Sequence, residues 1–461
     1  MSNFLFMCKW SLFLVGTASM AFGGDPSPPH TKIARLFIQD HPSRTLSWTD
    51  VTIDQNGKAD LGKLSPMEGI PKIDPTTQTL VQMRGAKGRI VLGIRDKEKG
   101  TIASGWVLMS AGAKFREHGD HGHWDYTTKP FVFDNKIDTE QGNPAHVYEY
   151  DEVFYLANDS KNGFTQLDPE RWFRSVEGKI TLGKPRFFEG GGNHITLAAK
   201  SNRVAYATWI DGDGPNKGRV DVINMAGPPG KGYSFTLPTG VIHGATACAN
   251  KIFFAPADGI CWVLADSNMD HNPEKIEVFH ISLGKDGTKP RRTGAFANHG
   301  NHVFCVTGKG KAASLVILNA TEDRPNPITI PLHGGENNKP LTPAVVMVQG
   351  KKAHAFVFHD HDKKETANDL LEIFELDPNG DGDYADARLV KVFPVGSSCV
   401  DGHYGHHDVA FNAEGNYAFF TNPGDGTISV MNMTKWEIVG NFPVGGMPTH
   451  LLVWGGSESE D

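Results

Sequence analysis

A strand-rich unit recurs along most of this chain, with successive copies beginning 43 to 63 residues apart. Each copy begins with a His or a small residue and continues through a strand, a polar turn, an aromatic-rich strand, a Gly/Asp turn and a third strand. The copies begin near His146, His194, His243, Ala297, Ala344, His407 and His450. Periods of about 40 to 50 residues with about four strands each are typical of β-propeller blades.

The remaining pattern predicts an all-β fold. Short β-forming runs such as RIVLGIRD and YAFFTNPGDGTISVMN alternate with Gly, Asn, Asp and Pro turns from about residue 80 onward. One earlier unit at 88–110, and a terminal strand at 450–454 that could close the ring onto N-terminal strands, bring the count to seven blades. Eight blades stay open, because residues 31–53 could form another sheet. We expect one propeller domain over residues 24–455, followed by a short acidic tail at 456–461.

Composition narrows the class of function. The chain has 461 residues, is 39% hydrophobic, and carries 45 Lys+Arg against 53 Asp+Glu, for a net charge of −8. A chain of this length and apolar content can bury a large core, so wholesale disorder is excluded. The negative charge and the lack of a basic block argue against nucleic acid or an anionic membrane surface as partner.

The first 23 residues predict export. Their only charge is Lys9, followed by an apolar run at 10–22 and small residues, which is typical of a signal peptide; a retained membrane anchor is the alternative. We therefore expect a periplasmic or secreted protein without stable membrane insertion. The mature chain keeps four cysteines in no CxxC pattern, so a disulfide is possible but no pairing can be assigned. These are Cys248, Cys261, Cys305 and Cys399.

Histidines at one phase of the repeat predict a metal site. The first strand of each blade lines the central channel of a propeller, so residues at equal positions in different blades converge there. Histidine is the commonest metal ligand in proteins, and its neutral imidazole suits zinc, copper or nickel. The histidines that share this phase are His146, His194, His243, His407 and His450.

Three loops add further candidate ligands. The loop EHGDHGHWD places ligand-type side chains at nearly every non-glycine position, namely His118, Asp120, His121, His123 and Asp125, although a solvated polar loop is the alternative. The segment 403–408 adds His403 and His406 beside His407, directly before a blade strand. A calcium-type loop places oxygen ligands at Asp377, Asn379, Asp381 and Asp383, but Arg388 stands where the bidentate Glu should be, so a plain turn is the alternative.

These segments resemble the AztD family of periplasmic zinc metallochaperones. The resemblance covers roughly residues 85–453 and is carried by EHGDHGHWD, PAHVYEYDEVFYLAND, HGATACANKIFFAPADG and YGHHDVAFN. It implies a β-propeller that hands zinc to the solute-binding protein of an ABC importer. By motif, it implies zinc binding at His121, His123 and Asp125 of the loop, and at the blade-entry residues His146, His243 and His407.

Three functions remain open on the sequence. The first is a monomeric, non-enzymatic zinc carrier with exchangeable His and carboxylate ligands, which would lose zinc between about pH 6.5 and 5 as imidazoles become protonated. The second is a metal-dependent propeller enzyme, lactonase-like or an oxidoreductase, that uses the same histidines; the chain has no HExxH, GxSxG or P-loop signature. The third is a binding propeller without metal.

Overall fold

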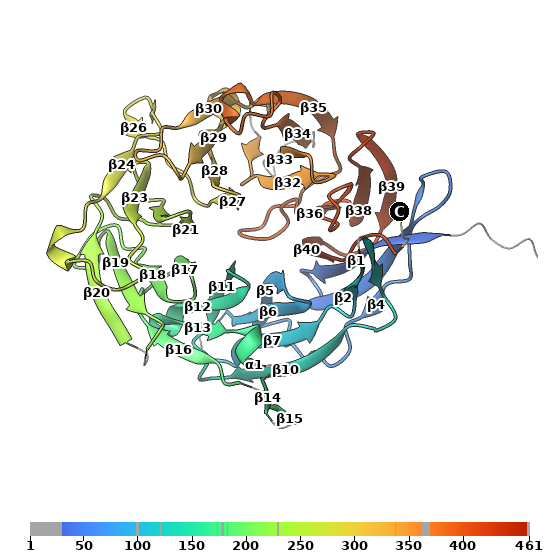
Figure 1. Cartoon of the computed structure of the whole chain (residues 1–461), viewed down its shortest axis with the longest axis horizontal. Coiled ribbons are helices and arrows are strands. Elements are labelled where there is room, and N and C mark those ends of the chain that lie inside the picture. The colour runs from blue at the N-terminus through green and yellow to red at the C-terminus, as the bar shows by residue number, and fades with distance from the viewer. Residues whose placement is uncertain are drawn as a thin grey trace, which may run out of the picture.

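The computed structural model describes residues 30–458 apart from 98–100, 120, 173, 177–178, 182, 228–229, 337 and 362–368. Within these residues, eight antiparallel sheets of four or five strands stand in a ring around a central opening (Figure 1). The fold is therefore the all-β propeller that the repeat predicts. It has eight blades, the count left open above, and not the seven that the spacing favours.

Each blade runs from an inner strand at the channel to an outer strand at the rim. Blade 1 contains β40 (Pro448–Trp454), β1 (Thr31–Asp40), β2 (Thr45–Ile53), β3 (Ala59–Leu61) and β4 (Ser65–Pro66). Blade 2 contains β5 (Gln78–Ala86), β6 (Arg89–Asp96), β7 (Ser104–Ser110) and β10 (Phe131–Asp138). Blade 3 contains β11 (Pro144–Tyr150), β12 (Val153–Asn158), β13 (Gly163–Leu167) and β16 (Arg186–Glu189). Blade 4 contains β17 (Leu197–Lys200), β18 (Val204–Thr208), β19 (Arg219–Asn224) and β20 (Gly230–Thr236).

The second half of the chain continues the ring in order. Blade 5 contains β21 (Ala245–Cys248), β22 (Lys251–Phe254), β23 (Ile260–Leu264) and β24 (Phe279–Ile281). Blade 6 contains β27 (Ala297–His299), β28 (His302–Thr307), β29 (Ser314–Asn319) and β30 (Ile328–Pro331). Blade 7 contains β31 (Lys339–Pro340), β32 (Ala344–Val348), β33 (Lys352–Asp360), β34 (Leu370–Glu375) and β35 (Arg388–Pro394). Blade 8 contains β36 (Val409–Phe411), β37 (Tyr417–Asn422), β38 (Thr427–Asn432) and β39 (Glu437–Pro443).

Smaller elements lie outside the blades. Two-stranded hairpins are formed by β8 (Lys114–His118) with β9 (His121–Asp125), β14 (Arg174–Val176) with β15 (Lys179–Thr181), and β25 (Lys285–Asp286) with β26 (Lys289–Pro290). In the described ranges, the one α-helix is α1 (Pro169–Trp172), and short 3₁₀ turns lie at Asp159–Lys161, Pro273–Lys275, Gly310–Ala312 and Tyr384–Asp386. No helix of the described chain has the length and apolar character needed to cross a bilayer.

Blade 1 is built from both ends of the chain, which explains the eighth blade. The last strand, β40, pairs antiparallel with β1, and β1 pairs with β2. The run at 31–53 therefore supplies the middle strands of a sheet whose inner strand comes from residues 448–454. Nearly the whole chain lies between these two parts. Counting repeats along the sequence therefore does not recognise them as one blade.

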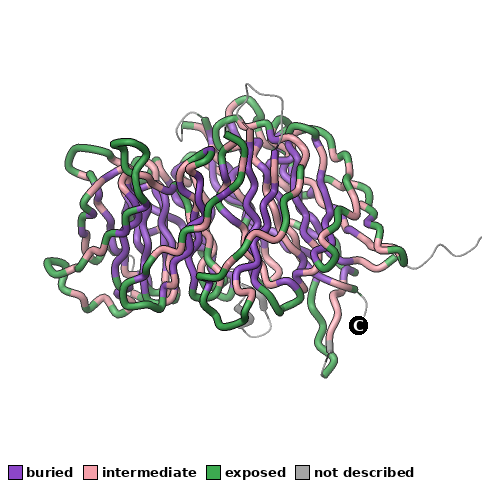
Figure 2. Tube along the Cα trace, turned by 90° about the horizontal axis from the view of Figure 1, so that it is seen from above, coloured by how far each residue is buried: buried purple, intermediate pink, exposed green. Residues whose placement is uncertain are grey.

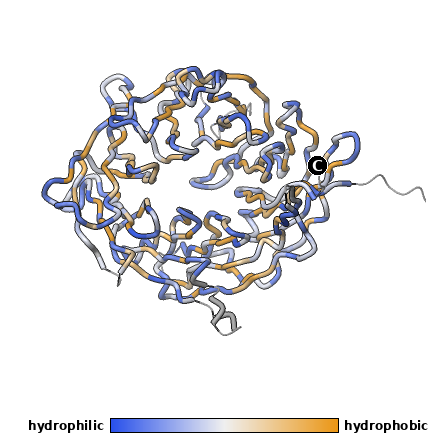
Figure 3. The backbone as a smooth tube through the Cα atoms, in the orientation of Figure 1, coloured by the Kyte–Doolittle hydropathy of each residue, from blue (hydrophilic) through white to orange (hydrophobic). Residues whose placement is uncertain are grey.

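The core lies between the blades. Eight apolar clusters occupy the eight contacts between neighbouring sheets in the described chain. In β28, for example, Phe304 packs toward blade 7, whereas Val303 and Cys305 pack toward blade 5, because successive side chains of a strand point to opposite faces. A strand that is buried on both faces has apolar residues at successive positions and not only at alternate ones. Figures 2 and 3 show the result: buried, hydrophobic strands inside, with exposed, hydrophilic loops at the edges.

Arg35 links blade 1 to the segment between β7 and β10 of blade 2. Its side chain is 1% exposed. The guanidinium donates to both carboxylate oxygens of Asp50, at 2.6 and 3.1 Å, and to the carbonyl oxygens of Ala111 and Thr128, at 3.2 and 2.8 Å. Bidentate hydrogen bonds between a guanidinium and a carboxylate are stronger than hydrogen bonds between neutral groups.

We predict that Arg35→Ala lowers the free energy of unfolding by about 3–5 kcal/mol, because it leaves buried acceptors and a charge without partners. Urea unfolding followed by tryptophan fluorescence measures the effect. Lys311→Ala is the control, since its pair with Glu336 is 3.5 Å long between side chains that are 86% and 76% exposed, and such pairs contribute under about 1 kcal/mol. Equal effects of the two substitutions would contradict the prediction.

Candidate metal centre

A cavity of about 610 Å³ opens at the end of the channel where the inner strands begin. Its wall includes His146 from β11, His450 from β40, His194 just before β17, and His403 from the loop before β36. His243, just before β21, adjoins His194 with ring centroids 5.3 Å apart. The shared phase of the blade-entry histidines therefore does bring four of the predicted ligands, His146, His194, His243 and His450, to one end of the channel.

Four of these imidazoles form a row, which we call the histidine row: His146, His194, His243 and His403. The Nε2 atoms of His146 and His194 are 3.0 Å apart. Two nitrogens bound to one tetrahedral zinc ion lie about 3.3 Å apart, so this pair already has nearly the required spacing. The row continues with ring-centroid separations of 5.3 Å from His194 to His243 and 6.5 Å from His243 to His403.

Hydrogen bonds at Nδ1 orient two members of the row. His194 Nδ1 lies 3.2 Å from Oδ2 of Asp159, and His243 Nδ1 lies 3.2 Å from the carbonyl oxygen of Gly294. Both acceptors require a proton on Nδ1, which leaves Nε2 as the free lone pair. A carboxylate or a carbonyl behind the imidazole is the usual support of a metal-binding histidine, because it fixes the tautomer and raises the basicity of the ligand.

His146 has a different support. The amide Nε2 of Gln82 lies 3.3 Å from its Nδ1, while Oε1 of Gln82 accepts from the Val147 N–H at 3.3 Å. In this arrangement the proton of neutral His146 is on Nε2 and points at Nε2 of His194. An ion bound between the two rings would replace that proton.

The cavity favours the neutral form of three histidines of the row, His146, His243 and His403. Burial, followed by the neighbouring His194 and His243, lowers the pKa of His146 well below the ordinary value of 6.5. Burial also lowers the pKa of His243, and burial together with His194 and His243 lowers that of His403. Each group penalises a positive charge on the next. Since only the neutral imidazole coordinates a metal, these shifts keep the ligands available at neutral and mildly acidic pH.

Asp159 fixes both the row and the cavity wall. It follows β12, and its side chain is 7% exposed. Besides His194, it accepts from the backbone N–H of Ile195 at 3.1 Å and from Arg95 at 3.2 Å. Neither Asp159 nor Gln82 belongs to a ligand motif, so the sequence does not point to them. Their role becomes visible only because the fold places them beside the histidine row.

A long loop completes the cavity. The chain between β35 and β36 carries His403 to the histidine row, and Tyr404 stacks on His41 at a centroid distance of 3.8 Å. Burial and the charge of Arg44 lower the pKa of His41 to about 4. His403 belonged to a predicted cluster, whereas His41 carries no pattern in the sequence and enters the cavity only through the β1–β2 turn.

The predicted loop EHGDHGHWD lies at the opposite end of the channel. It forms the exposed hairpin β8–β9 beside the C-terminus, where Trp124 N–H donates to Ser457 O at 3.0 Å (Figure 2). Trp124 also contacts Trp454 at a centroid distance of 6.3 Å. Trp454 is four residues along β40 from His450, or about 13 Å. The hairpin and the histidine row therefore cannot share one ion.

Within the hairpin, the rings of His118 and His123 stack at 5.0 Å. Asp125 is bound by the Thr127 N–H and the Arg116 guanidinium, and these lower its pKa to about 2. An ion at Asp125 would compete with Arg116. Asp120 lies outside the described residues, and only the backbone of His121 is described. Zinc binding by these residues stays a prediction.

His406 and His407 do not line the cavity but turn toward blade 7. His407 is 5% exposed, with Nε2 at 3.1 Å from Oδ2 of Asp369. His406 places Nδ1 at 2.6 Å from Oδ2 of Asp360. His450, by contrast, stays at the cavity wall, where its Nδ1 is 3.5 Å from Asp408. The blade-entry histidines thus divide between the channel and the space between blades 7 and 8.

The remaining predictions concern calcium, the cysteines and the termini. In the 377–383 loop, Asp377 and Asn379 accept N–H bonds from Gly380, Asp381 and Gly382, as in an ordinary Asx turn. Calcium there stays a prediction. Within the described chain the cysteines are free thiols, three buried and Cys399 exposed. The predicted signal peptide lies outside the described residues. At the start of the tail, Glu458 N–H donates to Lys32 O at 2.9 Å.

No protein-family model matches the chain, and no curated protein matches its sequence. Solved structures do match. Citrobacter koseri AztD superimposes with a TM-score of 0.59 at 16% identity, and its apo form with 0.58 at 15%, each over 93% of this chain and 99% of the other. The chain has the AztD-like propeller fold. The dihydro-heme d1 dehydrogenase NirN matches with a TM-score of 0.51 at 12% identity, over 95% of this chain and 77% of NirN.

The AztD-like fold supports the resemblance carried by the sequence motifs, but identities this low speak for the fold alone. Because an AztD protein and a dehydrogenase share this ring of sheets, the fold does not separate a carrier from an enzyme. Function must be argued from the site.

We predict that Asp159→Asn weakens zinc binding about 10- to 100-fold, as expected when the carboxylate behind a ligand histidine is lost. Competition against a chromophoric chelator measures the affinity. Asp258→Asn is the control, because Asp258 faces His280 at 3.5 Å on another blade, outside the cavity. An unchanged zinc affinity in Asp159→Asn would contradict the assignment of His194 as a zinc ligand.

Proposed function

We propose that this protein is an exported zinc carrier that binds Zn²⁺ at the histidine row and passes it to the solute-binding protein of a zinc ABC importer. The observation that carries the proposal is the pair of facing Nε2 atoms of His146 and His194, 3.0 Å apart, with Asp159 behind His194. The AztD-like fold and the motif-level resemblance to that family support the choice of zinc and of the partner.

The form of the site suits exchange better than storage. Its ligands are imidazoles from four different segments, and no cysteine lines the cavity among the described residues. A closed Cys₄ cage holds zinc for folding, whereas an open set of imidazoles can give up one ligand at a time. His403 is exposed on its loop. A partner that offers its own ligands at this opening could take the ion stepwise, without a free intermediate.

Zinc titration tests the binding step. We expect the wild type to bind zinc in competition with a chromophoric chelator, and the variant His146→Ala/His194→Ala to bind one ion fewer. His280→Ala is the control, since His280 lies on β24 away from the cavity. Equal zinc binding in the wild type and the double variant would refute the histidine row as the zinc site.

Transfer needs a separate measurement. The zinc-loaded protein is mixed with the apo solute-binding protein, and the transfer rate is compared with zinc loss to a small chelator. A carrier should deliver zinc faster than it releases the ion spontaneously. Equal rates would leave a zinc-binding protein without carrier function. Zinc-dependent turnover of a small substrate, lost in the same double variant, would favour the metalloenzyme instead.

The lowered pKa values set the expected pH dependence. A ligand histidine must be neutral, and burial lowers the pKa of His146, His243 and His403, so the neutral form persists to more acidic pH than in a free imidazole. We therefore expect half of the zinc to be lost below pH 6.5, toward the acidic end of the range that unperturbed histidines predict. Zinc retention measured by equilibrium dialysis from pH 7.5 to 4.5 checks this. A midpoint at or above 6.5 would contradict it.

A further inference from the structure

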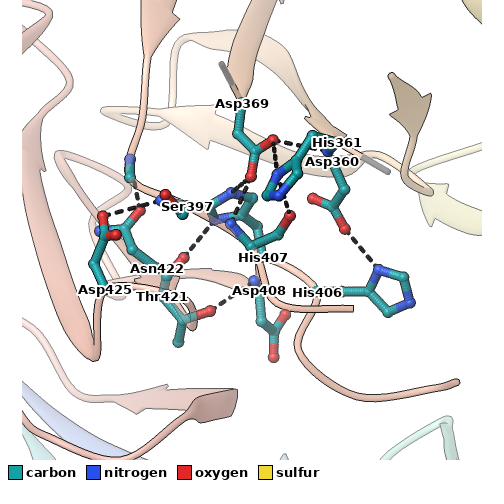
Figure 4. Close-up of polar contacts among 12 residues, drawn as sticks. Asp360, His361, Asp369, Ser397, His406, His407, Asp408, Thr421, Asn422 and Asp425 are labelled. Atoms are coloured by element: carbon teal, nitrogen blue, oxygen red, sulfur yellow. Dashed lines mark hydrogen bonds and ion pairs between the residues drawn. The ribbon is translucent and has the colours of Figure 1, made fainter. Parts of the chain in front are cut away.

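A second group of ligand-type side chains lies away from the cavity, between blades 7 and 8 (Figure 4). Asp360 ends β33, Asp369 directly precedes β34, and His407 lies two residues before β36. One ligand atom from each lies within 4.8 Å of the others. The three residues are 2%, 1% and 5% exposed. Two carboxylates and an imidazole are thus gathered out of contact with solvent.

His407 and Asp369 are held in orientations that suit a ligand role. Nδ1 of His407 donates to the carbonyl oxygen of Thr421 at 2.6 Å, so Nε2 is directed toward Asp369. Asp369 accepts from the backbone N–H groups of Ser398, at 2.5 Å, and of His361, at 2.7 Å. A backbone carbonyl behind the imidazole and N–H groups behind the carboxylate are common supports of metal ligands.

Asp360 supplies the independent observation. Its Oδ2 lies 2.6 Å from Nδ1 of His406, but its Oδ1 is buried and has no hydrogen-bond partner in the described structure. A buried carboxylate oxygen without a partner costs free energy, because it has lost water and gained nothing. One oxygen of this carboxylate lies within 4.8 Å of ligand atoms of Asp369 and His407. A cation there would satisfy the oxygen and offset two negative charges.

We propose that Asp360, Asp369 and His407 form a buried site for a divalent transition-metal ion of the Zn²⁺ type, separate from the histidine row. Mixed carboxylate and imidazole ligands are typical of zinc, at about 2.0–2.2 Å from the ion. Ligand atoms within 4.8 Å of one another need only small movements to close around one ion. His361, whose Nδ1 is 2.8 Å from Asp369, is placed to become a fourth ligand.

The site lies where it would influence the cavity. His407 belongs to the loop that carries His403 and Tyr404 into the cavity, and Ser398 of the same loop is bound by Asp369. An ion at Asp360, Asp369 and His407 would tie this loop to blade 7. We therefore expect the buried ion to order the loop that completes the cavity. The proposal does not rest on the zinc-carrier function, since it concerns different ligands.

The test is the number of zinc ions retained per chain after metal-free protein is loaded with Zn²⁺ and desalted, measured by mass spectrometry. Asp360→Asn keeps the shape of the side chain but removes its charge, and should retain one ion fewer than the wild type. Asp425→Asn is the matched control: this exposed carboxylate accepts from the Ser397 N–H of the same loop at 2.9 Å but is outside the group. It should retain the wild-type number.

His194→Ala separates this proposal from the proposed function. It should lose the ion of the histidine row and keep the buried one, so that Asp360→Asn/His194→Ala loses both. Loss of an ion only in His194→Ala would overturn the buried site and leave the carrier function intact. Loss only in Asp360→Asn would support the buried site and refute the histidine row.

A stability measurement covers the case in which Asp360→Asn does not fold. In His194→Ala, which keeps all three ligands of the buried site, added Zn²⁺ should raise the melting temperature, because an ion that binds only the folded state stabilises it. An unchanged melting temperature would overturn the proposal, and the Asp369–His407 contact would then be a buried ion pair that holds the loop.

Discussion

Closure of the ring is the constraint on which the rest of this structure depends. A propeller sheet buries both of its faces against neighbours, so no blade is stable alone, and one open contact would expose an apolar cluster to water. Here the chain closes the ring by pairing its last strand, β40, with its first, β1. Arg35 then ties this blade to blade 2 through its hydrogen bonds to the carbonyl oxygens of Ala111 and Thr128. Closure also fixes the axis around which the inner strands converge.

Convergence on that axis creates the site. His146, His194 and His243 come from three successive blades, yet their rings follow one another at 4.8 and 5.3 Å because each stands at the beginning of its blade. Burial in the cavity lowers the pKa of His146 and His243 and so favours their neutral forms. The same residues on a flexible surface would keep ordinary pKa values and no common ligand geometry.

Much of the fold and part of the site can be predicted from the sequence. The repeat predicts a propeller. The shared phase of His146, His194 and His243 predicts that these side chains lie close together at the channel. The repeat spacing favours seven blades and not eight, because the strands of one blade lie at opposite ends of the chain. The roles of Asp159 and Gln82 cannot be predicted from the sequence, because the hydrogen-bond partner of an imidazole depends on which neighbouring segment lies behind the ring. His407 has the predicted phase, but hydrogen bonds to Thr421 and Asp369 turn its ring between the blades.

The loop before β36 links the two groups of histidines. It places His403 at the histidine row and, four residues later, His407 beside Asp369. Its length also explains why one repeat interval is longer than the others. The EHGDHGHWD hairpin is set apart from both groups at the other end of the channel, so a role for it would be separate from the cavity.

The most direct test of the zinc-carrier account is a crystal structure of the zinc-loaded protein with anomalous scattering measured on both sides of the zinc absorption edge. The account predicts a zinc peak in the cavity within about 2.0–2.1 Å of Nε2 of both His146 and His194. A cavity without a zinc peak, in crystals that hold zinc only at the hairpin or elsewhere, would contradict it.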